Sequence, residues 1–335
     1  MTTPATALAP GGPRLSAIGL GCWAIGGPFL FEGRPDGWGQ VDDAESIRAL
    51  NRAADLGITL FDTADAYGTG HSERVLGRAL ASRRDEVIIA TKFGFTPDES
   101  RREITGTDVS PAYVRRACEA SLTRLGTGSI DLYQLHVGEI SPVQADDVFA
   151  VLDELADEGK IRRYGWSTDD PQRARQLRGR RRAAAVQFRL NVLSDAPDMV
   201  TACDELELTG LARTPLAMGL LTGKFGASSR LPPDDVRGSG HTWVTYFQDG
   251  RPGPEFLRRL DAIREILTSD GRTLTQGALA WVMARGHRII PIPGFKSVAQ
   301  AEENAGALGA GPLTPAQLTE IDRLLDRQPQ HSPAG

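Results

Sequence analysis

The sequence predicts a single (β/α)8 barrel, on the basis of two observations. Short apolar runs alternate with helical stretches along the chain through about eight cycles, which indicates parallel strands joined by right-handed crossovers. The length of 335 residues also suits one large α/β barrel. We expect the barrel domain to span residues 14–328, with flexible tails at 1–13 and 329–335.

The predicted strands are short runs rich in Ile, Leu, Val and aromatic residues. They cover residues 18–23, 58–61, 87–91, 130–135, 161–166, 184–188, a segment near Leu211, and residues 289–292.

Several predicted helices begin at a Ser, Asp or Thr that is followed by proline. The side-chain oxygen caps the first turn, and proline at the first helical position loses no hydrogen bond. These starts are Ser110-Pro111, Ser141-Pro142, Asp170-Pro171 and Thr314-Pro315. Further helices are predicted over residues 43–56, 73–80 (with Ser72 as N-cap) and 195–206.

The composition indicates a soluble globular protein, with 40% apolar and 24% charged residues. A net charge of −5 gives no reason to expect a nucleic acid or membrane partner. Neither a signal peptide nor an apolar run of about 18 residues is present. The three cysteines, Cys22, Cys118 and Cys203, lack metal-ligand spacing, which favours a reducing compartment. We therefore expect a cytoplasmic protein without a metal site.

Polar residues stand where three predicted strands end. Asp62, Lys92 and His136 each follow an apolar run, and Tyr67 lies on the loop after Asp62. Taken singly, a strand-end lysine is more often a surface residue and a lone histidine a structural one. Because the carboxyl ends of barrel strands form the active site of this architecture, we expect the four side chains to meet there.

These side-chain types suit the protonation of an oxygen on which negative charge develops. A tyrosine with a pKa of about 10 is a weak acid at neutral pH. A nearby Lys92 ammonium lowers that pKa, and Asp62 holds the lysine charged and oriented. Neutral His136 can position a substrate oxygen. Carbonyl reduction is such a reaction, and a nicotinamide cofactor supplies its hydride.

The motifs FDTADAYG with GHSE, ATKFG and DLYQLH resemble the three signature regions of the aldo-keto reductase superfamily. The resemblance extends from GLGCW near the start to PGFKSVAQAEEN near the end. It implies a (β/α)8 oxidoreductase, a monomer or weak oligomer, that acts on an aldehyde, ketone or sugar. Tyr67 would be the general acid/base, supported by Lys92 and Asp62, and His136 would orient the carbonyl. The GLLTGKF stretch is similar to bacterial sugar and aldehyde reductases.

The resemblance also implies a set of cofactor contacts, for NADP(H) in preference to NAD(H). Arg213 stands where relatives usually have a tyrosine that stacks on the nicotinamide. It either lies against that ring or turns away to pair with a phosphate or an acidic loop residue. Thr168 stands where relatives have Asn. Lys296 is the expected partner of the 2′-phosphate, beside a helix capped by Ser297. No GxGxxG fingerprint is present, as expected for a barrel. The implied contacts are Gly21, Cys22, Trp23, Asp62, Ser167, Thr168, Gln187, Arg213, Thr214, Pro215, Leu216, Gly219, Leu221, Gly223, Lys224, Gly294, Lys296, Ser297, Gln300, Glu303 and Asn304.

Two features add to the functional prediction. Residues 226–253 form a long segment rich in Gly, Pro and aromatic residues, which at this face of a barrel usually shapes the substrate pocket. The arginine-rich run 173–182 is interpreted as a solvated helix face and turn. Two functions remain open: a working oxidoreductase, or a cofactor-bound redox sensor or regulatory subunit with little turnover. The unbroken Asp–Tyr–Lys–His set favours the enzyme.

Overall fold

Eight parallel strands form a barrel in this computed structural model, which describes residue 8 and residues 14–327. The strands pair in the order β1-β4-β5-β8-β9-β10-β11-β14. A parallel bridge between Gly21 and Gly294 joins the last strand back to the first, and the hydrogen bond from Gly21 N to Pro293 O supports it. The predicted (β/α)8 architecture is therefore confirmed. The predicted tails at 1–13 and 329–335 lie outside the described residues, apart from residue 8.

The barrel strands are close to the predicted runs but differ at their ends. Lys92 lies inside its strand instead of following it, and Asp62 is the last residue of its strand. His136 directly follows its strand, as predicted. The strands are β1 (Leu20–Gly21), β4 (Leu60–Asp62), β5 (Ile88–Phe93), β8 (Ile130–Leu135), β9 (Ile161–Ser167), β10 (Ala183–Arg189), β11 (Thr209–Arg213) and β14 (Ile289–Pro291).

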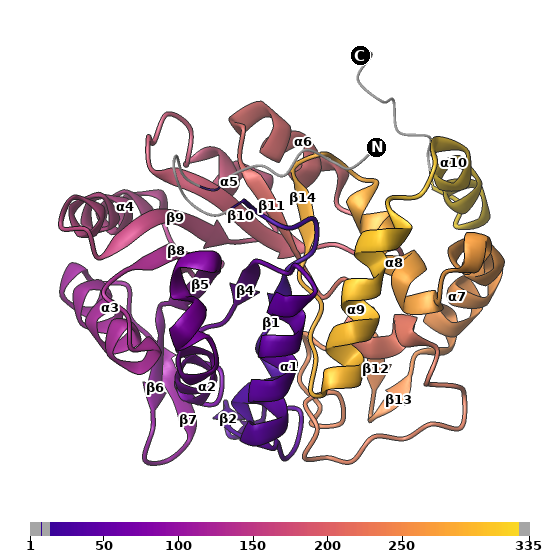
Figure 1. Ribbon diagram of the computed structural model, residues 1–335, viewed down its shortest axis with the longest axis horizontal. Helices are drawn as coiled ribbons and strands as arrows, with labels where there is room; N and C mark the ends of the chain where they lie inside the picture. Colours follow the sequence, from indigo (N-terminus) through magenta and orange to yellow (C-terminus); the bar gives the residue numbers. More distant parts are fainter. Residues whose placement is uncertain (1–7, 9–13, 328–335) are drawn as a thin grey trace.

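Helices surround the barrel on its outside (Figure 1). They are α1 (Asp43–Asp55), α2 (His71–Leu80), α3 (Pro111–Leu125), α4 (Pro142–Asp157), α5 (Pro171–Arg175), α6 (Pro197–Leu206), α7 (Pro254–Leu267), α8 (Leu274–Met283), α9 (Val298–Ala310) and α10 (Pro315–Leu324). Short 3-10 turns are η1 (Ala24–Gly26), η2 (Ala81–Glu86), η3 (Ala217–Thr222) and η4 (Ser269–Gly271). None of the helices in the described part of the chain has the length and apolar character needed to cross a bilayer.

The predicted Ser/Asp/Thr-Pro helix starts are confirmed. Ser110, Ser141, Asp170 and Thr314 are N-caps whose side chains accept hydrogen bonds from first-turn amides. The prediction that Ser72 caps α2 is wrong. Gly70 is the N-cap, and its φ of 89° lies in the left-handed region that favours glycine.

The hydroxyl of Ser72 forms hydrogen bonds with two neighbouring segments instead of capping the helix. It donates to Cys22 O (2.8 Å) and accepts from Thr63 Oγ1 (2.8 Å). The start of α2 is thereby tied to the ends of β1 and β4.

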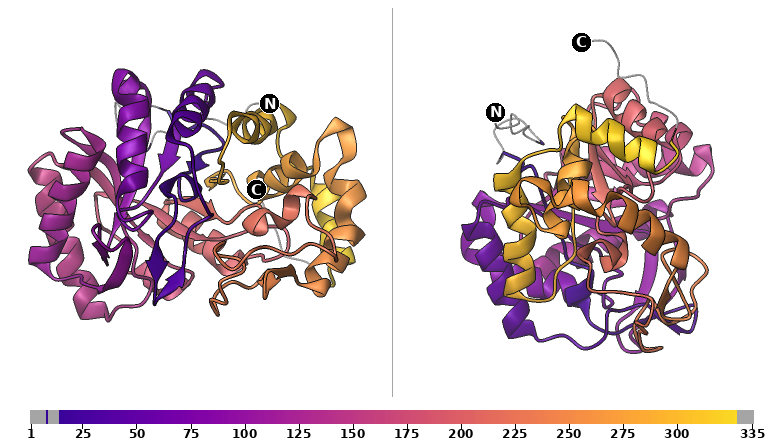
Figure 2. Two further views of the ribbon diagram at one scale, coloured as in Figure 1. Left: turned by 90° about the horizontal axis from the view of Figure 1, so that it is seen from below. Right: turned by 90° about the vertical axis from the view of Figure 1, so that its right-hand side faces the viewer.

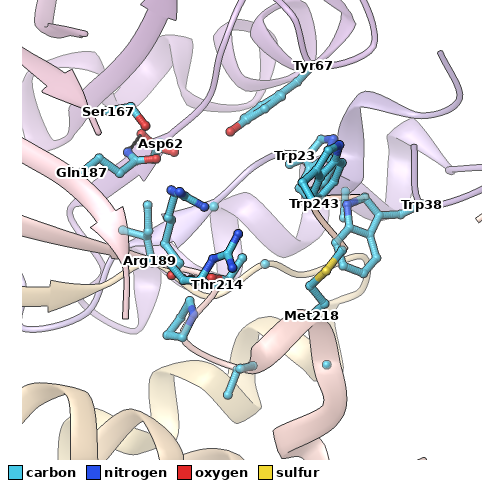
Figure 3. Close-up of a pocket in the computed structure, with 18 of the residues that line it drawn as sticks. Trp23, Trp38, Asp62, Tyr67, Ser167, Gln187, Arg189, Thr214, Met218 and Trp243 are labelled. Carbon is cyan, nitrogen blue, oxygen red and sulfur yellow. Dashed lines mark hydrogen bonds between the residues drawn. The ribbon is translucent and has the colours of Figure 1, made fainter. Parts of the chain in front are cut away.

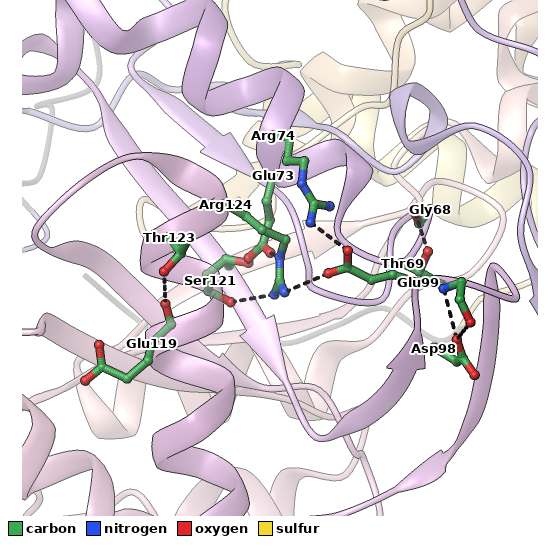
Figure 4. Close-up of polar contacts among 12 residues, drawn as sticks. Gly68, Thr69, Glu73, Arg74, Asp98, Glu99, Glu119, Ser121, Thr123 and Arg124 are labelled. Carbon is green, nitrogen blue, oxygen red and sulfur yellow. Dashed lines mark hydrogen bonds and ion pairs between the residues drawn. The ribbon is translucent and has the colours of Figure 1, made fainter.

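An ion-pair network joins α2, α3 and the strands next to them (Figure 4). Glu73, which is fully buried, accepts hydrogen bonds from Thr91 Oγ1 (2.6 Å) and Arg124 Nε (2.6 Å). Arg124 also pairs with Glu99 at 3.4 Å. These contacts join α2, α3 and β5, so they fix the backbone from which Lys92 projects.

Small added strands extend beyond the barrel on one side, at the lower edge of Figure 1 and of the right-hand view of Figure 2. Four of them form a sheet in the order β3-β2-β7-β6, and two form a hairpin within the long segment after η3. The sequence analysis did not predict them. They are β2 (Leu30–Phe31), β3 (Arg34–Pro35), β6 (Phe95–Asp98), β7 (Glu103–Thr107), β12 (Phe247–Gln248) and β13 (Arg251–Pro252).

The long segment after η3 contacts the segment that joins β1 to α1. Trp38 and Asp235 form an antiparallel bridge, and Val236 N donates to Gly37 O (2.9 Å). These contacts place the two segments at the same end of the barrel.

Candidate active site

The polar site is a continuation of the barrel interior. Along a strand, every second side chain points to the same face. The buried interior cluster includes Leu60, Ala90, Leu132 and Ala185. Two residues further along the same strands stand Asp62, Lys92, Gln134 and Gln187. The inward face therefore changes from apolar to polar at one level, toward the carboxyl ends of β4, β5, β8 and β10.

Lys92 connects the polar residues at this level. Its Nζ atom donates to Asp62 Oδ2 (2.7 Å), Thr63 O (2.8 Å) and Tyr67 Oη (3.1 Å). The other carboxylate oxygen of Asp62 accepts from Gln134 Nε2 (3.1 Å) and Gln187 Nε2 (2.8 Å). All three donors of the buried ammonium and both oxygens of the carboxylate are thus hydrogen-bonded.

Burial controls the proton affinity of Tyr67. Desolvation raises the pKa of Tyr67 above its usual value, the Lys92 ammonium opposes this, and Asp62 adds to it. The lowered pKa of Tyr67 that the nearby lysine alone predicts is therefore wrong, because burial outweighs the effect of the ammonium. Burial also acts to lower the pKa of Lys92, but the Asp62 carboxylate and Tyr67 raise it above its usual value. The site therefore holds a protonated tyrosine beside a charged lysine at neutral pH.

His136 faces Tyr67 as a neutral ring. The two rings are 5.8 Å apart in an edge-to-face arrangement. Burial holds the pKa of His136 well below its usual value, and the positive charges of Lys92 and Arg213 lower it further. Among the residues described here, none forms a hydrogen bond with its Nδ1 atom.

A cavity of about 1300 Å³ opens onto these residues. Figure 3 shows Asp62, Ser167 and Gln187 on one wall and Trp23, Trp243 and Trp38 on another, with the Tyr67 hydroxyl end pointing into the space between them. The site thus has a polar side and an aromatic side.

Most of the predicted site residues line this cavity, and a few do not. Those that line it are Gly21, Trp23, Asp62, Tyr67, His136, Ser167, Thr168, Gln187, Arg213, Thr214, Pro215, Leu216, Gly219, Lys224, Gly294, Lys296, Gln300, Glu303 and Asn304. Cys22, Lys92, Leu221, Gly223 and Ser297 are absent from the lining. Lys92 is fully buried behind Tyr67, and Ser297 instead caps α9 as predicted.

Arg213 has a partner that the sequence could not identify. Its guanidinium forms an ion pair with Asp169, on the loop after β9. Both residues line the cavity. Part of the positive charge near the catalytic residues is therefore neutralised by this carboxylate.

Lys224 and Lys296 lie in the cavity wall, and neither forms an ion pair with a carboxylate among residues 14–327. Burial lowers the pKa of Lys224 and of Lys296, and neighbouring Arg237 lowers both further. The Nζ atom of Lys296 donates to the carbonyl oxygens of Trp38 (2.8 Å) and Gln40 (2.9 Å). A bound anion such as a phosphate would restore the favourable charge balance, so these residues fit a phosphate-bearing ligand.

The structure adds cavity residues that the sequence analysis missed. They come from the segment joining β1 to α1, the added strands, β10, the loop after β9 with helix α5, and the long segment after η3. They include Phe29, Phe31, Asp36, Trp38, Phe95, Asp169, Arg173, Arg189, Asp235 and Arg237. The aromatic character of residues 23–38 was the one sequence signal for them. From the segment 226–253, Trp243, Thr245 and Tyr246 also line the cavity.

The fold and site define a (β/α)8 oxidoreductase, and comparison with known proteins shows its family. Residues 17–326 match the model of the aldo/keto reductase family, and the chain belongs to that family. It is 31% identical over 327 residues to the NADP(+) aldo-keto reductase yakc of Schizosaccharomyces pombe, covering 94% of this chain and 90% of the relative.

Two further proteins show how varied the relatives are. The chain is 34% identical over 315 residues to the chloroplastic pyridoxal reductase of Arabidopsis thaliana, covering 88% of this chain and 79% of the relative. The solved structure of a glycerol dehydrogenase from Gluconobacter oxydans is 30% identical, with a TM-score of 0.81 and 100% of both chains covered. The comparisons therefore show the family, and the names of these relatives refer to different substrates.

Proposed function

We propose that the protein uses NADP(H) to interconvert a carbonyl compound and its alcohol, with Tyr67 as the proton donor and acceptor. The observation that carries the proposal is the hydrogen bond from Lys92 Nζ to Tyr67 Oη (3.1 Å) at the edge of the cavity. A related protein is named as NADP(+)-dependent, and the charge balance around Lys224 and Lys296 suits the phosphates of that cofactor.

The nicotinamide group supplies the hydride when it is bound. Ser167 and Gln187 offer polar groups on the wall next to Asp62, where a carboxamide would bind. Lys224 and Lys296 would hold the phosphates. The negative charge that develops on the carbonyl oxygen requires a positioned proton donor.

Each catalytic residue has a role that follows from its contacts. Tyr67 donates its hydroxyl proton to the carbonyl oxygen, and the phenolate that results is stabilised by the Lys92 ammonium at 3.1 Å. Asp62 keeps Lys92 charged and directed at the tyrosine. Neutral His136 donates a hydrogen bond that orients the carbonyl, and it does not compete for the proton because its pKa is low. In the reverse direction, the phenolate accepts the proton of the alcohol.

Consumption of NADPH with a panel of aldehydes, ketones and sugars tests the proposal. The expected result is steady absorbance loss at 340 nm, in proportion to alcohol formed, with NADH less effective than NADPH. A redox sensor would instead bind NADPH with little turnover on every carbonyl tested. Binding of NADPH without turnover across the panel, in both directions, would contradict the proposal.

A further inference from the structure

The aromatic wall of the cavity starts at the catalytic tyrosine and continues outward. The Trp23 ring is stacked on Tyr67 with centroids 6.0 Å apart and planes at 24°. Trp243 lies 5.9 Å from Trp23, and His241 stacks on Trp243 at 5.3 Å. A substrate whose carbonyl reaches Tyr67 would therefore lay its carbon chain along Trp23 and Trp243 (Figure 3).

One carboxyl oxygen beside this wall receives no hydrogen bond from the part of the chain that the structure describes. Asp36 follows β3 and lines the cavity, and its side chain is 14% exposed. Its Oδ1 atom has no hydrogen-bond partner among residues 14–327. The backbone of Asp36 is fixed separately, because its carbonyl oxygen accepts from Trp23 Nε1 (3.1 Å). The side chain of Asp36 therefore lies at the aromatic wall, and its Oδ1 atom forms no hydrogen bond that would stabilise the described part of the fold.

A donor close to this oxygen, His241 Nε2, already forms another hydrogen bond. His241 Nε2 lies 3.5 Å from Asp36 Oδ1 but 3.2 Å from Pro35 O. A carbonyl oxygen only accepts hydrogen bonds, so the Nε2 proton of His241 is directed to Pro35. A buried polar group without a partner is unfavourable, and a ligand in the cavity can supply the missing partner.

The charge state of Asp36 indicates which group that partner is. Burial raises the pKa of Asp36 to about 8, and neighbouring Glu32 contributes to the rise. His241 is neutral as well, because burial lowers its pKa. A carboxyl group that is largely protonated at neutral pH both donates and accepts hydrogen bonds, and it offers little attraction to an ammonium group. A hydroxyl, which also donates and accepts, is the matching group.

We propose that Asp36 is a specificity-determining residue that hydrogen-bonds a hydroxyl group on the substrate's carbon chain while that chain lies against Trp23 and Trp243. The preferred substrates are then hydroxylated aldehydes or ketones. This inference rests on the proposed function, since it concerns the substrate that Tyr67 protonates.

A pair of three-carbon aldehydes tests the proposal, because glyceraldehyde carries two hydroxyls that propanal lacks. The native protein should show a higher kcat/KM for glyceraldehyde. Asp36→Leu should lower kcat/KM for glyceraldehyde by about tenfold, the usual effect of losing one hydrogen bond, mainly through KM. The value for propanal should change less than about twofold.

Two control variants separate recognition from folding. Asp36→Asn keeps a donor and an acceptor at the same place, so it should retain most of the preference for glyceraldehyde. Glu265→Gln changes an exposed carboxyl on α7, away from the cavity lining, and should leave both aldehydes unaffected. Equal losses for both aldehydes in Asp36→Leu, or no preference in the native protein, would overturn the proposal.

Binding measured without turnover distinguishes this proposal from the proposed function. Glycerol and propan-1-ol are titrated against the tryptophan fluorescence of the native protein and of Asp36→Leu. Tighter binding of glycerol that disappears in Asp36→Leu supports the role of Asp36 even if neither aldehyde is reduced. Equal binding of the two alcohols by the native protein refutes it, whatever the activity.

Discussion

Replacing Lys92 with methionine should destabilise the protein and stop turnover, for two separable reasons. Lys92 is fully buried, Asp62 is 2% exposed, and their charged atoms are 2.7 Å apart. At that distance and an effective dielectric of about 20, the attraction is ~6 kcal/mol. The cost of burying both charges offsets much of it, so the pair itself contributes little net stability.

The Lys92→Met variant loses stability because the charge of Asp62 remains buried without its partner. Lys92→Met leaves the Asp62 carboxylate buried with only the amides of Gln134 and Gln187 as donors. Breaking a buried pair in this way costs about 3–5 kcal/mol in the free energy of unfolding. Turnover should fall by about 10²-fold or more, because Tyr67 loses the cation that opposes the rise of its pKa.

Urea unfolding followed by tryptophan fluorescence measures the stability, and NADPH oxidation measures the turnover. The matched control is the double variant Lys92→Met with Asp62→Asn, which removes the remaining charge and keeps an oxygen for the two amides. It should recover the stability to within about 2 kcal/mol of the native protein but stay inactive. A loss below about 1 kcal/mol in Lys92→Met, or turnover within a few-fold of native, would refute this reasoning.

Other residues give sharper predictions about binding and pH. Lys296→Ala should raise the KM for NADPH by about tenfold and leave the KM for NADH almost unchanged, since a charge-assisted contact to the 2′-phosphate is lost. If steady-state kinetics show the same rise in KM for both cofactors, Lys296 has a structural role instead. Asp169→Asn should weaken the binding of NADP⁺ relative to that of NADPH by about fivefold in fluorescence titrations, because Arg213 then keeps its positive charge without the carboxylate that neutralises it. An unchanged ratio of the two affinities would mean that the charge of Arg213 lies away from the nicotinamide. The folded-state pKa of His136 is lowered, so its contribution to stability is present above about pH 6.5 and is lost as the pH falls below it. The difference in unfolding free energy between the native protein and His136→Asn should therefore change by up to about 1.4 kcal/mol per pH unit there, and a constant difference in urea titrations would contradict this.

The positions of the catalytic candidates could be predicted because they depend on local pattern. Asp62 and Lys92 each stand two residues beyond an apolar side chain on the inward face of a strand. In a parallel barrel, this alternation and the common strand direction bring them to the same level. His136 directly follows β8, so the same argument covers it. Tyr67 lies further along the loop after β4, so the pattern predicts only the end of the barrel at which it stands.

Contacts between distant segments could not be predicted in the same way. Trp38 and Asp235 form a bridge although they are far apart in the sequence, and Asp36 meets His241 through that same approach. The pairing of Arg213 with Asp169 also depends on how two loops fold over the barrel end. No local periodicity specifies such contacts.

The wrong assignment of Ser72 has a related cause. A serine before a helical run usually caps the helix, but the hydroxyl of Ser72 bonds to Cys22 and Thr63. The tertiary contact replaced the local one, and Gly70 with its positive φ starts the helix instead.

The most direct test of the central claim is the turnover of Tyr67→Phe, measured together with its affinity for NADPH. The substitution removes only the hydroxyl that Lys92 contacts at 3.1 Å. We expect kcat to fall by about 10²–10⁴-fold while the Kd for NADPH changes by less than about threefold, since the lysines that we propose hold its phosphates are untouched. Turnover within a few-fold of the native protein would contradict the claim that Tyr67 transfers the proton.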